Sequence, residues 1–391
     1  MCRVKVRYVL HNAYVTGGTI RTVVNQANAL CADHDVEIAS VYRSRSTPAF
    51  EIDPRVRLVP LTDLCSNGTR RTDPSGKRLL RKFRRFRNPL PHRYDFRYRR
   101  WDPAVDAAII RYFWAERTGV LITTRPALNL LSAWCAPRRL IRIGQDHMNL
   151  AAYRPKLRAE ILRAYPRLDA VTVLTERDLG DYREALGDRV RLARIPNGVP
   201  EPPDRSGIPE GKVLIAAGRL SPQKGFDLLV DAFAKVHARH PDWRLDIFGQ
   251  GELQRDIQAR IDGYGLTGAA RLRGVTGKLA EELTAAGMFV LSSRFEGLPM
   301  VLLEAMTLGV PAVAFDCPTG PAEIIEHGRT GLLVPPQDTG ALADGICELI
   351  EDPVRRAAMR AAARESSARY AKPAVRTLWE NLFAELAAAR A

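Results

Sequence analysis

The stretch "MFVLSSRFEGLPMVLLEAMTLGV", residues 288–310, has the order of a strand, a loop and a helix start. The apolar run at its beginning is typical of a buried strand, and Pro299 suits a first helical turn. Glu304 lies among apolar residues of the expected helix, and Glu296 lies in the loop before it. Because an ionised carboxylate is seldom buried without a partner, the two acids indicate a ligand site, and a structural salt bridge to an arginine is the alternative.

The same alternation of strands and helices continues on both sides of this stretch. Helical spacing of apolar residues predicts helices at 19–30, 225–239 and 374–389. Strands are expected at 4–10, 35–42, 119–124, 140–145, 170–175, 212–218, 243–249, 288–293, 311–316 and 331–336. This order predicts an α/β protein with two Rossmann-like, doubly wound domains that face each other across a cleft.

A segment rich in proline and glycine at 194–211 is typical of an interdomain linker. We therefore expect one domain over residues 1–198, with a basic insertion at about 66–100, and a second over 199–370. The closing helix, within 371–391, is expected to pack back toward the first domain.

Composition places the chain among ordinary globular proteins. Of its 391 residues, 46% are apolar and 26% are charged, and no apolar run reaches the length of a membrane span. Six scattered cysteines and the lack of an export signal in the opening residues predict reduced thiols and a cytoplasmic location.

The positive charge is concentrated in the first half of the chain. The formal net charge is +15, of which residues 1–200 contribute +18 and residues 201–391 contribute −3. Residues 70–100 hold 13 Lys and Arg against two Asp, and helical spacing predicts a cationic amphipathic helix at 76–87. Its cations include Arg81, Lys82, Arg84 and Arg85. We expect this patch to bind an anionic membrane surface or the substrate. The alternative is a solvated insertion that binds neither. No nucleic-acid-binding module is recognised.

A second candidate site follows the linker, in "GRLSPQKGFDLL" at 218–229. Arg219 ends an expected strand, and Lys224 precedes the glycine that opens a helix. Cations beside a helix N-terminus favour an anion site after a strand. The alternative is that Arg219 and Lys224 are solvated surface charges that bind no ligand.

The segments "RFEGLPMVLLEAM", at 294–306, and "GVPAVAFDCPTGPAEIIEHGRTGLLVPPQD", at 309–338, closely resemble the signature of retaining family-4 glycosyltransferases (glycosyl transferases group 1). That family has the two-domain GT-B fold. The match includes the Glu296–Glu304 spacing, residues 218–229, "FGQGE" at 248–252, "IPNGV" at 195–199 and the glycine pair at 17–18. It covers nearly the whole C-terminal half, but only short pieces of the N-terminal half.

The resemblance implies that the first domain binds the acceptor and the second binds a nucleotide sugar. Arg219 and Lys224 would bind the donor diphosphate. Glu304 would hold the ribose, and Glu296, with Gly297 and Leu298, the donor sugar. Gly18 would allow close backbone approach, the backbone at Val275 would read the base, and His147 would lie near the sugar. The implied catalytic residues are Arg219, Lys224, Glu296 and His147.

The residue types suit this chemistry. Glycosyl transfer leaves a diphosphate that gains negative charge in the transition state, so fixed cations aimed at it catalyse the reaction. We therefore expect no metal and no cofactor, because the nucleotide sugar is itself a substrate. The Asp33-x-Asp35 pair is interpreted as a turn on the wrong side of the sheet for a metal.

The resemblance thus implies a retaining hexosyltransferase, and the two cations favour metal independence. The expected donor is a UDP-sugar, and the expected acceptor is a cell-envelope glycan, lipid-linked or an anionic polymer. The inner face of the membrane is a further expected location. The alternatives are a sugar-nucleotide epimerase and a non-catalytic protein that binds nucleotide sugars or polyanions. A dehydrogenase is disfavoured because Gln254 replaces the third glycine of a dinucleotide-binding loop at 249–254.

Overall fold

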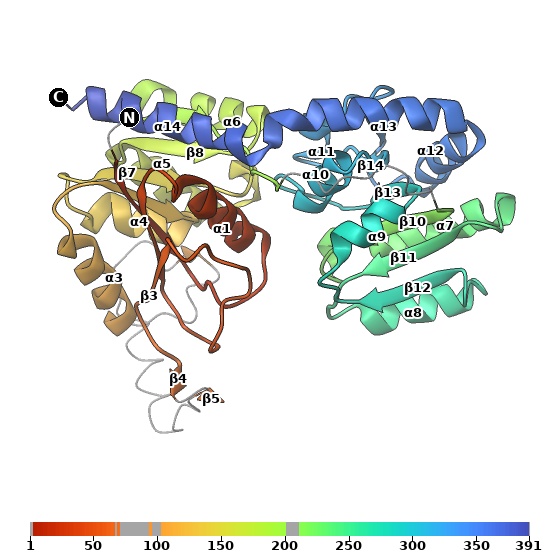
Figure 1. Ribbon diagram of the computed structural model, residues 1–391, viewed down its shortest axis with the longest axis horizontal. Helices are drawn as coiled ribbons and strands as arrows, with labels where there is room; N and C mark the ends of the chain where they lie inside the picture. The colour runs from red at the N-terminus through yellow and green to blue at the C-terminus, as the bar shows by residue number, and fades with distance from the viewer. Residues whose placement is uncertain (1–2, 67–68, 71–93, 96–102, 201–210, 391) are drawn as a thin grey trace. The chain divides into compact units, whose positions relative to one another are not determined.

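The computed structural model describes residues 3–66, 69–70, 94–95, 103–200 and 211–390. Its contacts divide the chain into two units (Figure 1). Unit 1 comprises Met1–Gly198 and Lys372–Ala391, and unit 2 comprises Val199–Ala371. No helix among the described residues is both long enough and apolar enough to span a bilayer.

Unit 1 is built on a seven-stranded parallel sheet in the order β3-β2-β1-β6-β7-β8-β9. The strands are β1 Lys5–Leu10, β2 Asp35–Ser40, β3 Arg57–Pro60, β6 Val120–Thr124, β7 Ile141–Gln145, β8 Ala170–Val173 and β9 Arg191–Arg194. The main helices are α1 Gly18–Leu30, α3 Pro103–Ala115, α4 Pro126–Cys135, α5 Pro155–Ala164, α6 Glu176–Leu186 and α14 Lys372–Ala388. A short antiparallel pair, β4 Cys65–Ser66 and β5 Thr69–Arg70, lies outside this sheet.

The two faces of this sheet carry separate apolar cores, as the period of two along β1 requires. Val6, Tyr8 and Leu10 pack with α1 and α14. Val9, one position out of phase, packs with α3 and α4. Helices therefore cover both faces, which makes unit 1 a doubly wound domain.

Unit 2 repeats the plan with six parallel strands in the order β12-β11-β10-β13-β14-β15. The strands are β10 Val213–Ala217, β11 Arg244–Phe248, β12 Ala270–Gly274, β13 Met288–Leu291, β14 Ala312–Phe315 and β15 Gly331–Val334. The helices are α7 Phe226–Arg239, α8 Gln254–Gly263, α9 Leu279–Ala285, α10 Met300–Thr307, α11 Pro321–Ile324, α12 Thr339–Glu351 and α13 Pro353–Ser367. The prediction of two Rossmann-like, doubly wound domains is confirmed.

The strand order reverses once in each sheet. The reversal lies between β1 and β6 in unit 1 and between β10 and β13 in unit 2. At such a switch point neighbouring loops turn in opposite directions, and ligands bind in the crevice that opens at the carboxyl ends of the strands. Each unit therefore offers one position for a site.

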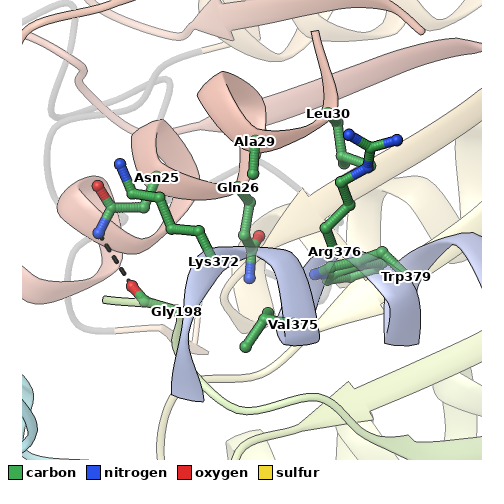
Figure 2. Close-up of a pocket in the computed structure, with 9 residues that line it drawn as sticks. All are labelled: Asn25, Gln26, Ala29, Leu30, Gly198, Lys372, Val375, Arg376 and Trp379. Carbon is green, nitrogen blue, oxygen red and sulfur yellow. Dashed lines mark hydrogen bonds between the residues drawn. The ribbon is translucent and has the colours of Figure 1, made fainter. Parts of the chain in front are cut away.

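Helix α14 follows unit 2 in the sequence but packs on α1 of unit 1. Trp379 is fully buried and meets Tyr8 edge to face at 6.5 Å between ring centroids. Figure 2 shows a small pocket between the two helices, where the Asn25 amide donates to the Gly198 carbonyl oxygen at 3.0 Å. The pocket lies between helices rather than at the carboxyl ends of strands, so we interpret it as a packing gap.

We predict that Trp379→Ala lowers the free energy of unfolding by about 3–5 kcal/mol, because it leaves a large cavity in a closed core. The neighbouring Leu378 is 38% exposed on the same helix. Leu378→Ala should therefore cost less than about 1 kcal/mol. Urea denaturation of both variants measures the difference, and equal losses would contradict the packing of α14 described here.

Candidate functional site

The switch point of unit 2 carries an ion pair between its two loops. Lys224 follows β10, and Glu296 follows β13. The Nζ of Lys224 lies 2.5 Å from Oε1 of Glu296, and the Ser293 hydroxyl donates to the same oxygen at 2.6 Å. The Glu296 side chain is only 7% exposed. The buried carboxylate thus has the partner that its burial requires.

A second ion pair fixes the two loops against each other. The two terminal guanidinium nitrogens of Arg294, Nη1 and Nη2, donate to the Asp227 carboxylate oxygens at 2.9 and 2.6 Å. Burial would raise the pKa of Asp227, but the hydrogen bonds and the charge of Arg294 outweigh it, so the pKa lies below its usual range. The Arg294 amide also donates to the Gln223 carbonyl oxygen at 2.8 Å. The Ser292 hydroxyl donates to the Lys224 carbonyl oxygen at 3.0 Å. Both loops are therefore held before any ligand arrives.

Arg219 lies on the same loop as Lys224. Its side chain is exposed and makes no hydrogen bond or ion pair with the described residues. A Cβ placed on the adjacent Gly218 would lie 3.1 Å from Cε of Lys224, so the lysine side chain runs along the backbone beside Arg219. The loop thus presents two cations, one anchored by Glu296 and one open to solvent.

Glycines allow these loops to approach one another closely. Gly249, after β11, has φ +141°, and a Cβ there would lie 1.8 Å from the Gly218 carbonyl oxygen. Gly225, before α7, has φ +61°, and a Cβ there would lie 2.1 Å from the Ser292 carbonyl oxygen. A side chain at either position would push the cation-bearing loop away from its neighbour.

The other predicted donor residues of unit 2 lie on the loops after β12 and β13 and on α10. Glu304 is half-buried on α10, between the buried Leu303 and Ala305. Leu298 is 6% exposed, so its side chain belongs to the core and only its main chain can meet a ligand. Val275, after β12, is 68% exposed. Gly297 accepts from the Thr319 hydroxyl at 3.4 Å, which ties this loop to the one after β14.

Two of the predicted site residues, Gly18 and His147, belong to unit 1. The four predicted cations of the basic patch lie outside the described residues. Gly18 begins α1 after β1, and a Cβ there would meet nothing within 4 Å. His147 follows β7. Arg81, Lys82, Arg84 and Arg85, with the expected helix at 76–87, fall within the part of the chain that the structure does not describe.

The environment of His147 keeps its imidazole neutral. The side chain is half-buried, and its Nε2 has no contact with solvent and no hydrogen-bond partner among the described residues. Burial, with the nearby Arg125 charge, lowers the pKa of His147 to about 3. At neutral pH this histidine can form hydrogen bonds but adds no positive charge to a site.

A buried aspartate holds the loop that carries His147, a feature that the sequence analysis did not predict. Tyr182 and Tyr165 donate to Oδ2 of Asp146 at 2.7 and 3.2 Å, and Tyr153 donates to Oδ1. Burial raises the pKa of Asp146, and these hydrogen bonds oppose the shift. Three tyrosines spread over 30 positions give no local sequence signal.

The sequence analysis also missed Ser293 of unit 2, the second donor to Glu296. A hydroxyl three residues before a buried acid could have suggested it.

We predict that Gly249→Ala lowers the free energy of unfolding by more than about 2 kcal/mol, since the new methyl group overlaps backbone and the backbone angle is strained. Gly263, at the end of α8 in the same unit, is the matched control because a Cβ there meets nothing within 4 Å. Gly263→Ala should be neutral or stabilising by up to about 1 kcal/mol. Urea denaturation distinguishes the two, and a harmless Gly249→Ala would contradict the close approach of these loops.

The lowered pKa of His147 predicts a dependence of stability on pH. The unfolded chain binds a proton near pH 6.5, whereas the folded chain binds it only near pH 3. The contribution of neutral His147 is therefore complete above pH 6.5 and is lost as pH falls toward 3. Between pH 7 and 4, wild type should lose more free energy of unfolding than His147→Gln, in which other titrating groups are unchanged. Parallel curves in urea denaturation would show that the imidazole is solvated.

Comparison with known proteins identifies the family of this chain. Residues 200–366 match the model of the family described as glycosyl transferases group 1. An exopolysaccharide phosphotransferase of Streptomyces coelicolor is 38% identical over 99% of this chain, which spans 41% of that relative's length. A GDP-mannose-dependent α-(1-6)-phosphatidylinositol monomannoside mannosyltransferase of Mycolicibacterium smegmatis is 30% identical, over 61% of this chain and 67% of the relative.

Among solved structures, S. aureus TarM in complex with fondaparinux, α-GlcNAc-glycerol and UDP superposes with a TM-score of 0.78 at 16% identity. The match covers 97% of this chain and 99% of that one, and at this identity it establishes the fold alone. The chain therefore has the GT-B fold and belongs to the family of glycosyl transferases group 1.

Proposed function

We propose that this protein transfers a sugar from a nucleotide-diphosphate donor to an exopolysaccharide or another cell-envelope glycan. The observation that carries the proposal is the Lys224–Glu296 pair at the switch point of unit 2, with Arg219 exposed on the same loop. A diphosphate needs fixed cations, and a sugar needs an oriented carboxylate that accepts from its hydroxyls. One loop pair supplies both kinds of group.

In this mechanism the bond between the anomeric carbon and the diphosphate oxygen breaks, and the leaving diphosphate gains charge. Lys224 stabilises that charge with little reorganisation, because Glu296 anchors its ammonium group and the Arg294–Asp227 pair holds the loops, and Arg219 adds an exposed guanidinium from the same loop. These cations take the role that a metal has in other transferases, so the proposal is metal-independent. Glu296 orients the donor sugar, Glu304 holds the ribose, and neutral His147 offers a hydrogen bond. The acceptor attacks on the face of the leaving group, with retention of configuration.

The test is nucleotide binding and release with UDP- and GDP-sugars. Both donors belong in the panel, because one relative is named for GDP-mannose and the TarM structure contains UDP. We propose a UDP-sugar as the donor. Calorimetry should show Arg219→Ala and Glu304→Ala each weakening nucleotide binding by about 10-fold or more, the usual size of a lost charge-assisted contact. Arg271→Ala, which removes an exposed charge from β12, is the control. If no donor binds, or if the control weakens binding equally, the site assignment is wrong.

A second candidate reaction is transfer of a sugar phosphate. It is favoured by the Streptomyces coelicolor relative, which is named a phosphotransferase and aligns with almost all of this chain. Sugar transfer releases a nucleoside diphosphate, whereas sugar-phosphate transfer cleaves the diphosphate and releases a nucleoside monophosphate. Chromatography of the released nucleotide separates the two, and we expect the diphosphate.

The basic segment at 70–100 is proposed to bring the protein to an anionic surface. Co-sedimentation with vesicles containing anionic lipid tests this, with vesicles of neutral lipid as the control. Loss of binding when Arg81, Lys82, Arg84 and Arg85 are replaced together by Gln would support a membrane role. Unchanged binding would leave the acceptor as the partner of this segment.

A further inference from the structure

Two buried hydroxyl groups after β13 act on the Lys224–Glu296 pair in different ways. Ser292 and Ser293 are each 1% exposed. The Ser292 hydroxyl donates to the Lys224 carbonyl oxygen at 3.0 Å, whereas the Ser293 hydroxyl donates to Oε1 of Glu296 at 2.6 Å. Ser292 therefore holds the main chain of the cation-bearing loop, and Ser293 holds the carboxylate itself.

Both contacts of the Glu296 carboxylate end on the same oxygen. The Nζ of Lys224 lies 2.5 Å from Oε1, the oxygen that also accepts from Ser293. A carboxylate oxygen has two lone pairs, so these two contacts use the capacity of Oε1. The other oxygen, Oε2, accepts no hydrogen bond from the part of the chain that the structure describes, and it keeps contact with solvent. A hydroxyl group of a ligand is therefore directed to Oε2.

The main chain of Glu296 is fixed, so only the direction of its side chain has to be set. The Glu296 amide donates to the Pro318 carbonyl oxygen at 2.9 Å, and the Thr319 amide donates to the Glu296 carbonyl oxygen at 3.0 Å. The Thr319 hydroxyl donates to the same carbonyl oxygen at 3.2 Å. Because the backbone is held in this way, the direction of Oε2 depends on the contacts at Oε1.

Ser293 is better suited than Lys224 to keep this direction during a reaction. The lysine ammonium has three donors at the end of a flexible stem, and in the proposed function it also binds the leaving diphosphate. The serine hydroxyl is one carbon away from the main chain of a buried residue, so it cannot follow the phosphate. The Ser293 contact with Oε1 therefore persists when the ammonium group moves.

We propose that Ser293 is a positioning residue, which holds Oε1 of Glu296 so that Oε2 accepts a hydrogen bond from one hydroxyl of the donor sugar. This inference rests on the proposed function for the identity of the ligand. Ser293 acts through Glu296 and does not touch the sugar. Its effect is selectivity for donors that carry this one hydroxyl.

The kinetic test compares donors that differ in a single hydroxyl. The probes are the donor that wild type turns over fastest in the panel of UDP- and GDP-sugars, and its deoxyfluoro analogues, in each of which fluorine replaces one hydroxyl. The ratio of kcat/KM for the donor to that for an analogue measures the discrimination at that hydroxyl. At one hydroxyl this ratio should fall about fivefold in Ser293→Ala, because the carboxylate is no longer aligned with it. The electronic effect of fluorine is the same in every variant and cancels in this comparison.

Three further variants control the test. Ser292→Ala removes an equally buried hydroxyl that does not contact the Glu296 carboxylate, so it should leave every ratio within about twofold of wild type. Ser293→Thr keeps the hydroxyl and should keep the discrimination of wild type. Ser293→Cys has a similar size but is a weak donor, so it should give an intermediate ratio. It also covers the case in which Ser293→Ala does not fold.

Binding of the free nucleotide excludes a purely structural role. Calorimetry should show that Ser293→Ala binds UDP or GDP within about twofold of wild type, because the free nucleotide has no donor sugar. If the variant loses affinity for the nucleotide as strongly as it loses discrimination, Ser293 serves the packing of the loop and the inference is wrong.

The kinetic outcomes separate this inference from the proposed function. Turnover by wild type with an unchanged ratio at every hydroxyl in Ser293→Ala overturns this inference alone, as does an equal fall in Ser292→Ala. If wild type turns over no donor, the proposed function fails and this inference fails with it.

Discussion

The Lys224–Glu296 ion pair is the interaction on which the arrangement of unit 2 depends. Its two partners lie 72 positions apart and meet because β10 and β13 are neighbours where the strand order reverses. Removal of either partner would leave a charge in a place that is mostly closed to water, which costs more than the pair itself contributes. The pair therefore holds the two loops together and sets the direction of the lysine. An ammonium group has three donors, so one contact with Glu296 leaves it able to bind phosphate oxygens.

Each unit carries a cation with a carboxylate partner at the carboxyl ends of its strands, Lys224 with Glu296 in unit 2 and Arg125 with Asp95 in unit 1. In unit 2 the site is built from charges that compensate each other, and the chain around it is close to neutral overall. In unit 1 the carboxyl ends of β6 and β7 carry a strained arginine, a histidine kept neutral and an aspartate enclosed by three tyrosines. Burial keeps His147 neutral, so it adds no positive charge beside Arg125, whose guanidinium contacts Asp95. The reversal of strand order fixes where each site lies, and the burial of its titratable groups fixes the charge that it presents.

The periodicity of apolar residues was enough to predict most of the sheet strands, because buried strands such as β10 and β13 have uninterrupted apolar runs. In the two parallel sheets it missed β3, β9 and β12. Arginine interrupts the apolar pattern of β9 and β12 at every second position, as in "RLAR" at 191–194, and β3 has only four residues, none of them buried. The motif residues of unit 2 could be named from the sequence because they lie in short segments. Their pairing could not, because Lys224 and Glu296 lie 72 positions apart and no local pattern links the two side chains that contact each other. The neutrality of His147 and the strain at Arg125 depend on burial and backbone angles, which no local pattern encodes.

The glycines explain why the motifs of unit 2 are easier to recognise from sequence than those of unit 1. In unit 2 the backbones after β10, β11 and β13 approach so closely that a single methyl group at Gly225 or Gly249 would overlap a carbonyl oxygen. A site formed by packed backbone tolerates few substitutions, so its sequence pattern stays recognisable. In unit 1 the corresponding first loop is open, and a methyl group at Gly18 would meet nothing. The first loop of unit 1 can therefore change its side chains with less effect on backbone packing than the loops of unit 2.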